Sequence, residues 1–211
     1  MSSGRAVPKA AVFRLSLYLR QLEVLSRSGR ETVSSRELGH ALNLTAAQVR
    51  KDLAYFGQFG YRGVGYKVDE LGEQLRRILG TDHKWNVVVL GAGNLGRALS
   101  GYRGFRKQGF NIVGVFDSDV AKVGRRAGDL VIQSMATLPE VVRRLDVKIA
   151  LVCVPSESAQ RVAEQATRAG VRGVFNFAPV TLDLPEGVAL VSEDLAIRLE
   201  QLSVELTKLH A

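Results

Sequence analysis

The fold of this chain is decided by the stretch Trp85-Asn86-Val87-Val88-Val89-Leu90-Gly91-Ala92-Gly93-Asn94-Leu95-Gly96. Its first half is a short apolar run rich in valine, which predicts a buried strand. Its second half is a G-x-G-x-x-G turn, which leads through Arg97 into a predicted helix. A second predicted strand, 110–116, ends at Asp117, which lies 21 residues after Gly96. In this context the turn predicts a dinucleotide site in which Asp117 holds a ribose hydroxyl.

The rest of this half of the chain alternates predicted strands and helices. Strands are expected at 85–90, 110–116, 130–133, 148–154, 172–177 and 188–191, and helices at 94–108, 137–145 and 157–169. Such an alternation predicts an α/β fold, a Rossmann-type doubly wound parallel sheet, with its ligand at the carboxyl ends of the strands.

The residues at those strand ends are the expected cofactor contacts: Gly91, Ala92, Gly93, Asn94, Leu95, Gly96, Asp117, Val154, Pro155, Phe177, Ala178 and Pro179. A carboxylate at Asp117 repels a 2′-phosphate, so NAD(H) is favoured over NADP(H). Lys122, Arg125 and Arg126 weaken that preference slightly. An apolar nicotinamide end disfavours the cationic oxidised ring. The expected cofactor is therefore NADH, with NAD⁺ weaker or competing.

The N-terminal part predicts a winged helix-turn-helix. An amphipathic helix begins near Pro8 and stops at Gly29. Capping boxes at 34–37 and 45–48 start two short helices across the turn Asn43-Leu44. A Gly- and aromatic-rich hairpin, 57–67, is expected to form a β-wing with Arg62 at its tip, and a helix at 69–79 completes the module.

The net charge of +8 is concentrated in this part, because residues 1–85 hold 14 Lys/Arg and 8 Asp/Glu, against 15 and 13 in residues 86–211. Such a module is a candidate DNA binder, although charge alone fits a merely basic surface equally well. The expected DNA contacts are Thr45, Ala47, Gln48, Arg50, Lys51, Tyr55, Arg62 and Tyr66.

The last predicted helix starts at Ser192. Its leucines, at 195, 199, 202, 206 and 209, repeat at intervals of four and three residues. This stripe fits either dimerisation or packing on its own domain. The expected domains are 1–82 (winged helix), 83–191 (Rossmann) and 192–211 (dimerisation helix).

The composition, 46% hydrophobic and 24% charged, is that of a soluble globular protein, and no apolar run is long enough to cross a membrane. The single cysteine, Cys153, excludes an intrachain disulfide and fits a reducing cytoplasm. None of the histidines, His40, His83 and His210, lies at a predicted strand end. We therefore expect a cytoplasmic protein without a catalytic or metal site, and not an enzyme.

The chain resembles the Rex family of redox-sensing transcriptional repressors over nearly its whole length. The resemblance is carried by Gln48-Val49-Arg50-Lys51-Asp52-Leu53, Tyr55-Phe56-Gly57, Arg62-Gly63-Val64-Gly65-Tyr66, the glycine turn at 91–96 and Asn176-Phe177-Ala178-Pro179. It implies a homodimer with winged-helix heads and domain-swapped C-terminal helices. It also implies binding to an inverted-repeat operator in double-stranded DNA when NADH is low, and release when NADH rises. Target genes would be those of respiration and of fermentative NADH reoxidation.

By position, the resemblance also marks Arg20, Lys51, Tyr102, Asp194 and Leu195 as interdomain switch residues. Tyr102 and Arg20 would alternate as partners of Asp194. The family often has an aromatic residue where this chain has Leu195.

Two other functions fit the residues alone. One is a small NAD-dependent oxidoreductase whose basic head is incidental, which the missing acid–base group and substrate domain disfavour. The other is a DNA-binding regulator that senses a coenzyme A ester or another nucleotide.

Overall fold

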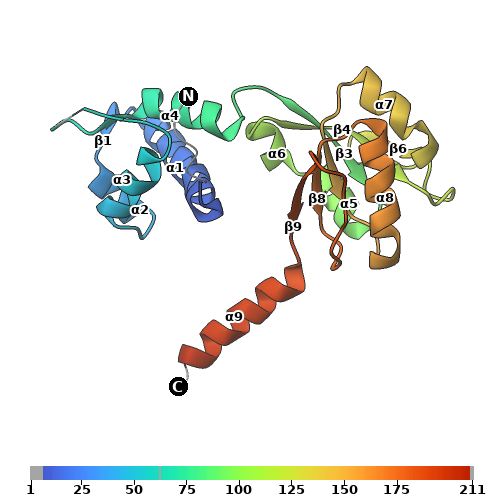
Figure 1. Cartoon of the computed structure of the whole chain (residues 1–211). Coiled ribbons are helices and arrows are strands. Elements are labelled where there is room, and N and C mark those ends of the chain that lie inside the picture. Colours follow the sequence, from blue (N-terminus) through green and yellow to red (C-terminus); the bar gives the residue numbers. More distant parts are fainter. Residues whose placement is uncertain (1–6, 62, 210–211) are drawn as a thin grey trace. The chain divides into compact units, whose positions relative to one another are not determined.

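The computed structural model describes residues 7–61 and 63–209 (Figure 1). The chain divides into two compact units, Met1–His83 and Lys84–Ala211. We call them the head and the nucleotide unit. The division falls one residue after the boundary expected at residue 82.

The head contains α1 (Lys9–Arg27), β1 (Thr32–Val33), α2 (Ser35–Ala41), α3 (Ala46–Ala54), β2 (Tyr66–Lys67) and α4 (Val68–Leu79). Its core is built around α1, which buries Leu15 and Leu22. Leu38 of α2, Val49 of α3 and Leu75 of α4 join the same cluster. The two helices of the helix-turn-helix are therefore fixed by packing on α1.

The start of α2 matches its predicted capping box. The Ser34 side chain accepts a hydrogen bond from the Glu37 N–H, and the Glu37 carboxylate accepts one from the Ser34 N–H. The box expected for α3 is only half formed. Thr45 Oγ1 accepts from the Gln48 N–H at 3.1 Å, but the Gln48 side chain binds Asp52 instead of returning to Thr45.

The predicted hairpin is present, although it is short. Tyr61 and Gly65 form an antiparallel bridge, with the Gly65 N–H donating to the Tyr61 carbonyl at 3.0 Å. The chain then continues into β2, which pairs with β1 through Val33 and Tyr66. The strand β1 is only two residues long and was not predicted. Arg62, expected at the tip, lies outside the described residues.

The nucleotide unit holds a seven-stranded sheet. Its strands are β3 (Trp85–Leu90), β4 (Phe110–Asp117), β5 (Arg126–Ala127), β6 (Leu130–Ser134), β7 (Ile149–Val152), β8 (Gly173–Asn176) and β9 (Ala189–Ser192). They lie in the order β5-β6-β4-β3-β7-β8-β9. All neighbours are parallel except β5, which is antiparallel to β6. The direction of winding reverses between β3 and β7, as predicted for a doubly wound sheet.

The helices of this unit are α5 (Asn94–Ser100), α6 (Arg103–Lys107), α7 (Leu138–Arg144), which follows a 3₁₀ turn at Met135–Thr137, α8 (Ser156–Ala169) and α9 (Leu195–Leu209). The single helix expected at 94–108 is wrong. Gly101 ends α5, and Tyr102 takes an extended backbone before α6 begins. Glycine is a poor helix former, so the chain breaks there.

The expected start of the last helix at Ser192 is also wrong. Ser192 is the last residue of β9 and pairs with Asn176 of β8. The helix begins at Leu195, and the Asp194 carboxylate accepts a hydrogen bond from the Ala196 N–H at 2.9 Å. Asp194 therefore acts as the N-cap of α9, a position that favours aspartate.

The two faces of the sheet bury alternate residues. Val88 and Leu90 pack in one cluster with the apolar sides of α7 and α8, whose ribbons lie on the same side of the sheet in Figure 1. Val87 and Val89 point to the opposite face, toward Leu99 of α5 and its neighbours. This alternation is the period of a strand covered on both sides, and it leaves the carboxyl ends of β3, β4, β7 and β8 at one edge.

Candidate functional sites

The glycine turn brings three segments into close contact. The Gly91 N–H donates to the Phe116 carbonyl at 2.7 Å, and Gly91 has a φ of +100°, which glycine adopts without strain. A Cβ at Gly91 would overlap the Cys153 carbonyl, and a Cβ at Gly96 would overlap the Gly91 carbonyl. The glycines are therefore required for the approach of β3, β7 and α5, and they leave the backbone at the start of α5 open to a ligand.

Asp117 lies at the end of β4 beside this turn, and its side chain is 9% exposed. One carboxylate oxygen accepts from the Ala92 N–H at 2.7 Å, and the other accepts from the Asp119 N–H at 2.8 Å. Burial opposes ionisation of Asp117, but these bonds and Lys122 outweigh it, so its pKa is lowered. The group is thus an ionised acceptor at the position expected for a ribose-binding carboxylate.

The other expected cofactor residues follow neighbouring strands. Val154 and Pro155 come after β7, and Phe177, Ala178 and Pro179 come after β8. Ala178 is buried, whereas Pro155 and Pro179 are exposed. The topology therefore brings all the residues of the predicted cofactor set to the carboxyl edge.

Asn176 fixes the loop after β8 and was not singled out as a site residue of its own. Its buried side-chain amide donates to the carbonyls of Ala178 at 3.0 Å and of Val180 at 2.9 Å, and its oxygen accepts from the Ala178 N–H. Phe177 packs against Phe175 with ring centroids 4.3 Å apart. The loop thus presents a shaped, largely apolar surface at the edge of the sheet.

Cys153 follows β7, and its carbonyl lies beside Gly91 of the glycine turn. Burial raises the pKa of its thiol to about 12. The thiol is therefore protonated at neutral pH and a poor nucleophile.

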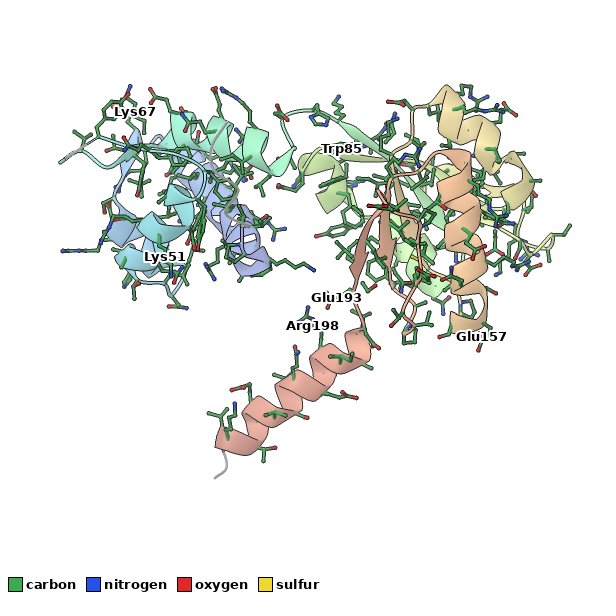
Figure 2. The ribbon with its side chains drawn as sticks, viewed as in Figure 1. Lys51, Lys67, Trp85, Glu157, Glu193 and Arg198 are labelled. Carbon is green, nitrogen blue, oxygen red and sulfur yellow. The ribbon has the colours of Figure 1, made fainter. Side chains whose placement is uncertain are left out.

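In the head, α3 presents one side to the core and the other to solvent. Val49 and Leu53 are buried, as predicted. Ala47, Arg50 and Lys51 are exposed, and Figure 2 shows Lys51 on α3. These residues form a slim, basic surface of the kind that enters a major groove.

The remaining expected DNA contacts differ in exposure. Thr45 is exposed and caps α3, whereas Gln48 and Tyr55 are half-buried. Tyr66 is only 7% exposed and packs in the head core, so its ring supports the hairpin. This placement argues against the surface position that the sequence analysis gave it.

A buried ionic network around Asp52 was missed by the sequence analysis. Asp52 is 0% exposed and accepts two hydrogen bonds from Arg14, at 2.5 and 2.7 Å. It also accepts from the Tyr18 hydroxyl and the Gln48 amide, both at 2.7 Å. Burial opposes ionisation, but the hydrogen bonds outweigh it and lower the pKa of Asp52. The network ties α3 to α1 by charge as well as by packing.

The signal for this network is a matched spacing. Arg14 and Tyr18 are four residues apart on one helix, and Gln48 and Asp52 are four apart on another, so each pair shares a face. The pairing of the two faces needs the fold.

A second contact orients the exposed side of α3. Arg50 donates to the Ser35 hydroxyl at 2.9 Å, which links α3 to the first turn of α2. A cleft of about 620 Å³ is lined by Arg50 and Ser35 and by residues of the hairpin, among them Gly57, Tyr61 and Gly65. The Arg50 guanidinium, hydrogen-bonded to Ser35, lies in a cleft lined by several glycines, and such a guanidinium is suited to bind a phosphate.

The expected switch residues are divided between the two units. Arg20 and Lys51 are exposed in the head. In the nucleotide unit, Tyr102 is 59% exposed and Leu195 is 55% exposed, while Asp194 caps α9. Their alternation as partners stays a prediction.

Two kinds of site are absent from the described residues. Over 7–61 and 63–209, no three His, Cys, Asp or Glu side chains are grouped to hold a metal ion. Within the same ranges, none of the helices has the length and apolarity to cross a membrane.

The two units together define a class of protein, in which a helix-turn-helix head is joined to a dinucleotide-type fold. Residues 6–54 match a family described as a putative DNA-binding protein N-terminus, and residues 82–180 match the CoA binding domain family. The redox-sensing transcriptional repressor Rex of Carboxydothermus hydrogenoformans is 49% identical over 97% of this chain and 99% of its own. Rex of Pelotomaculum thermopropionicum is 46% identical over 96% and 95%.

Solved structures agree. The Rex-family repressor RSP, in complex with β-NAD⁺ and operator DNA, matches with a TM-score of 0.91 at 37% identity, over 98% of this chain and 95% of that one. RSP in complex with β-NADH matches with a TM-score of 0.85 at 35% identity, over 98% and 97%. The chain belongs to the Rex family of redox-sensing transcriptional repressors.

We expect Asp52→Asn to lower the free energy of unfolding of the head by about 2–3 kcal/mol, because it leaves the Arg14 charge without its partner. The expected loss is smaller than for a fully buried pair because the Arg14 side chain is 23% exposed. Denaturation followed by circular dichroism measures the loss, and the fluorescence of Trp85, in the nucleotide unit, separates the two transitions.

The difference from wild type depends on pH. The pKa of Asp52 is lowered by folding, so its contribution is present above its ordinary value of 3.8 and is lost as the pH falls below that value. The difference should be constant from about pH 6 to 8 and shrink near pH 3. Asp69→Asn, at an exposed carboxylate that accepts from Ser26, is the matched control and should stay within about 0.5 kcal/mol. A difference in the free energy of unfolding between Asp52→Asn and wild type that does not change with pH would contradict an ionised Asp52.

Proposed function

We propose that this chain represses transcription by binding an operator through its head, and that NADH bound in its nucleotide unit releases the DNA. The observation that carries this proposal is the presence, in one chain, of an exposed basic α3 on a helix-turn-helix and of an ionised Asp117 bonded to the glycine turn. The named complexes of RSP support the same pair of ligands for a relative of nearly equal length.

The dinucleotide assignment rests on the chemistry of the carboxyl edge. The backbone at Gly93 and Asn94 receives the pyrophosphate, and Asp117 accepts from the adenosine ribose. Phe177 and Ala178 line the nicotinamide end. An apolar wall stabilises the neutral reduced ring relative to the cationic oxidised ring, so NADH binds more tightly than NAD⁺.

The DNA assignment rests on α3. Lys51 and Ala47 face the major groove, and Arg50, held by Ser35, contacts a phosphate beside the groove. Thr45, Gln48 and Tyr55 lie at the edges of this surface. The Asp52 network keeps α3 in one position, so little ordering is needed when DNA binds.

A homodimer follows from an apolar groove and an unpartnered helix. The groove, of about 340 Å³, lies on the sheet and is lined only by apolar side chains and glycine, among them Phe105, Ile112 and Phe175. The helix α9 exposes all its leucines; Leu199 is 68% and Leu209 is 78% exposed. Such surfaces rarely stay in water. We infer that α9 of one protomer packs on the groove of the other, in a domain-swapped arrangement.

The dimer explains how the ligands are coupled. Two heads read an inverted repeat only when their recognition helices are spaced by about one turn of DNA or a multiple of it. NADH favours another arrangement of the heads and thereby weakens DNA binding, and operator DNA must weaken NADH binding by the same factor.

We do not assign an enzymatic activity. The carboxyl edge offers no histidine, and the half-buried Cys153 has a thiol whose pKa is raised, so it is protonated at neutral pH. The relatives are named as repressors. The runner-up is a regulator of the same architecture that senses coenzyme A, in keeping with the match of residues 82–180.

The function is tested by a gel shift on a duplex that carries the operator of the RSP complex, titrated with NADH, NAD⁺, NADPH and coenzyme A in parallel. NADH should release the duplex at the lowest concentration. Asp117→Ala should bind the duplex as wild type does but require about tenfold more NADH, because the ribose loses its acceptor. A duplex that stays bound at millimolar NADH would refute the proposal, and release by coenzyme A alone would favour the runner-up.

Lys51→Glu should weaken operator binding by at least about tenfold, because a cation in the groove is replaced by an anion. Binding of NADH should not change. Lys107→Glu, at an exposed lysine of α6, is the matched control and should bind the operator as wild type does. Fluorescence anisotropy over a range of salt concentrations measures both affinity and its salt slope. Equal operator affinities for the two variants would show that α3 is not the recognition helix.

Leu202→Glu should convert the dimer to a monomer, because it places a charge in the leucine stripe that packs on the groove. Ser203→Glu adds the same charge beside the stripe and should leave the dimer intact. Size-exclusion chromatography with light scattering measures the masses. A wild-type protein that is monomeric at micromolar concentration would instead indicate that α9 packs on its own groove.

A further inference from the structure

The lone pairs of Asp117 do not suffice for the ligand proposed above. An ionised carboxylate offers about four acceptor sites. Three are filled: by the N–H of Ala92 at 2.7 Å, the N–H of Asp119 at 2.8 Å and the ammonium of Lys122 at 3.1 Å. A ribose that donates both its hydroxyls needs two sites. One of the three donors must therefore leave when the adenosine binds.

Lys122 is the donor that can leave. The amides of Ala92 and Asp119 are held by the backbone, the first in the glycine turn and the second in the turn after β4. The Lys122 side chain is 39% exposed, and a flexible chain of four methylene groups carries its ammonium. Its ammonium already lies 3.7 Å from a carboxylate oxygen of Asp119, which gives it a second partner.

The backbone keeps the displaced ammonium nearby. The Lys122 N–H donates to the Asp119 carbonyl at 3.0 Å, so the residue stays in the turn that follows Asp117. A phosphate on the ribose carries nearly two negative charges at neutral pH and is repelled by Asp117. A cation in that position attracts the phosphate and offsets part of this repulsion.

We propose that Lys122 is a specificity-determining residue of the nucleotide site. In the free protein it occupies the acceptor site that the ribose needs, and in the complex it lets the site tolerate a 2′-phosphate. This inference rests on the proposed binding of NADH. The chemical class it adds is the phosphorylated dinucleotide NADPH, as a weaker ligand of the same site.

The test compares the dissociation constants of NADH and NADPH, by calorimetry, for the full chain and for Lys122→Met. The uncharged side chain vacates the carboxylate, so NADH should bind at least as tightly as in wild type, whereas NADPH should bind more weakly. The dissociation constant of NADPH divided by that of NADH should therefore rise by about fivefold or more, since a half-exposed ion pair changes affinity by a factor of a few. Lys122→Arg keeps the charge and should leave the ratio near that of wild type.

The matched control is Lys148→Met. Lys148 pairs with Asp146 at 2.7 Å before β7, at the opposite end of that strand from the site. It should leave both constants unchanged, and the circular dichroism spectra and melting temperatures of the variants report their folding.

The inference and the proposed function fail in different ways. If wild type binds NADH and the ratio is unchanged or lower in Lys122→Met, Lys122 does not set specificity. Wild type that binds NADH but shows no binding of millimolar NADPH also overturns the inference. Wild type that binds neither dinucleotide refutes the proposed function itself.

Discussion

The hydrogen bond from the Ala92 N–H to the Asp117 carboxylate is the interaction on which the nucleotide site depends. It joins the turn after β3 to the end of β4, the two strands at the centre of the sheet. A buried carboxylate is stable there only because backbone N–H groups and Lys122 supply what water would. A ribose donates its hydroxyls to the same two carboxylate oxygens of Asp117. The structure therefore keeps an ionised carboxylate with an unfilled acceptor site at its carboxyl edge, and we propose that a bound ribose takes the place of Lys122.

The head also contains a buried carboxylate that is held by hydrogen bonds, but there it fixes a helix. Asp52 is also an ionised carboxylate in a buried place, and Arg14, Tyr18 and Gln48 satisfy it fully. No acceptor site is left for a ligand, so the network serves to hold α3. A buried charge pair of this kind adds little net stability over apolar packing, but its geometry allows one arrangement of the two helices. One fixed arrangement suits the proposed role of α3, because residues that read DNA must keep their register on it.

Much of this architecture could be predicted from the sequence, because period and capping are local. The strand β3 and the helix-turn-helix follow from short patterns whose meaning does not change with context. The failures are equally physical. Ser192 is a good cap residue, but pairing with Asn176 draws it into β9 and moves the cap to Asp194. The strands β1 and β5 have two residues each, too few to show a period.

The site residues likewise fall into those that a local sequence pattern identifies and those that depend on tertiary contacts. The glycine turn and Asp117 are fixed by a spacing along the chain and could be named in advance. Lys122 could also be named as a nearby cation, but its contact with Asp117 depends on a side-chain conformation, and the Asp52 network depends on contacts between helices, which no single-sequence pattern encodes. Tyr66 shows the reverse error, since an aromatic residue in a glycine-rich hairpin is equally suited to the surface and to the core, and the core is where it lies.

The nucleotide site and α9 meet at one residue. Asn176 shapes the loop of Phe177 and Ala178 through its side chain, while its carbonyl accepts from the Glu193 N–H at 2.9 Å. Figure 2 shows Glu193 and Arg198 together where β9 gives way to α9, and their side chains form a two-point ion pair. The hydrogen bond between Asn176 and Glu193 therefore links the loop after β8 to the residues that precede α9. Coupling between a ligand and a dimer helix requires only that one such element have two arrangements and that the ligand prefer one of them. The loop of Phe177 and Ala178 belongs to the candidate cofactor site and Asp194 caps α9, so we propose that the segments joined by this hydrogen bond are such an element.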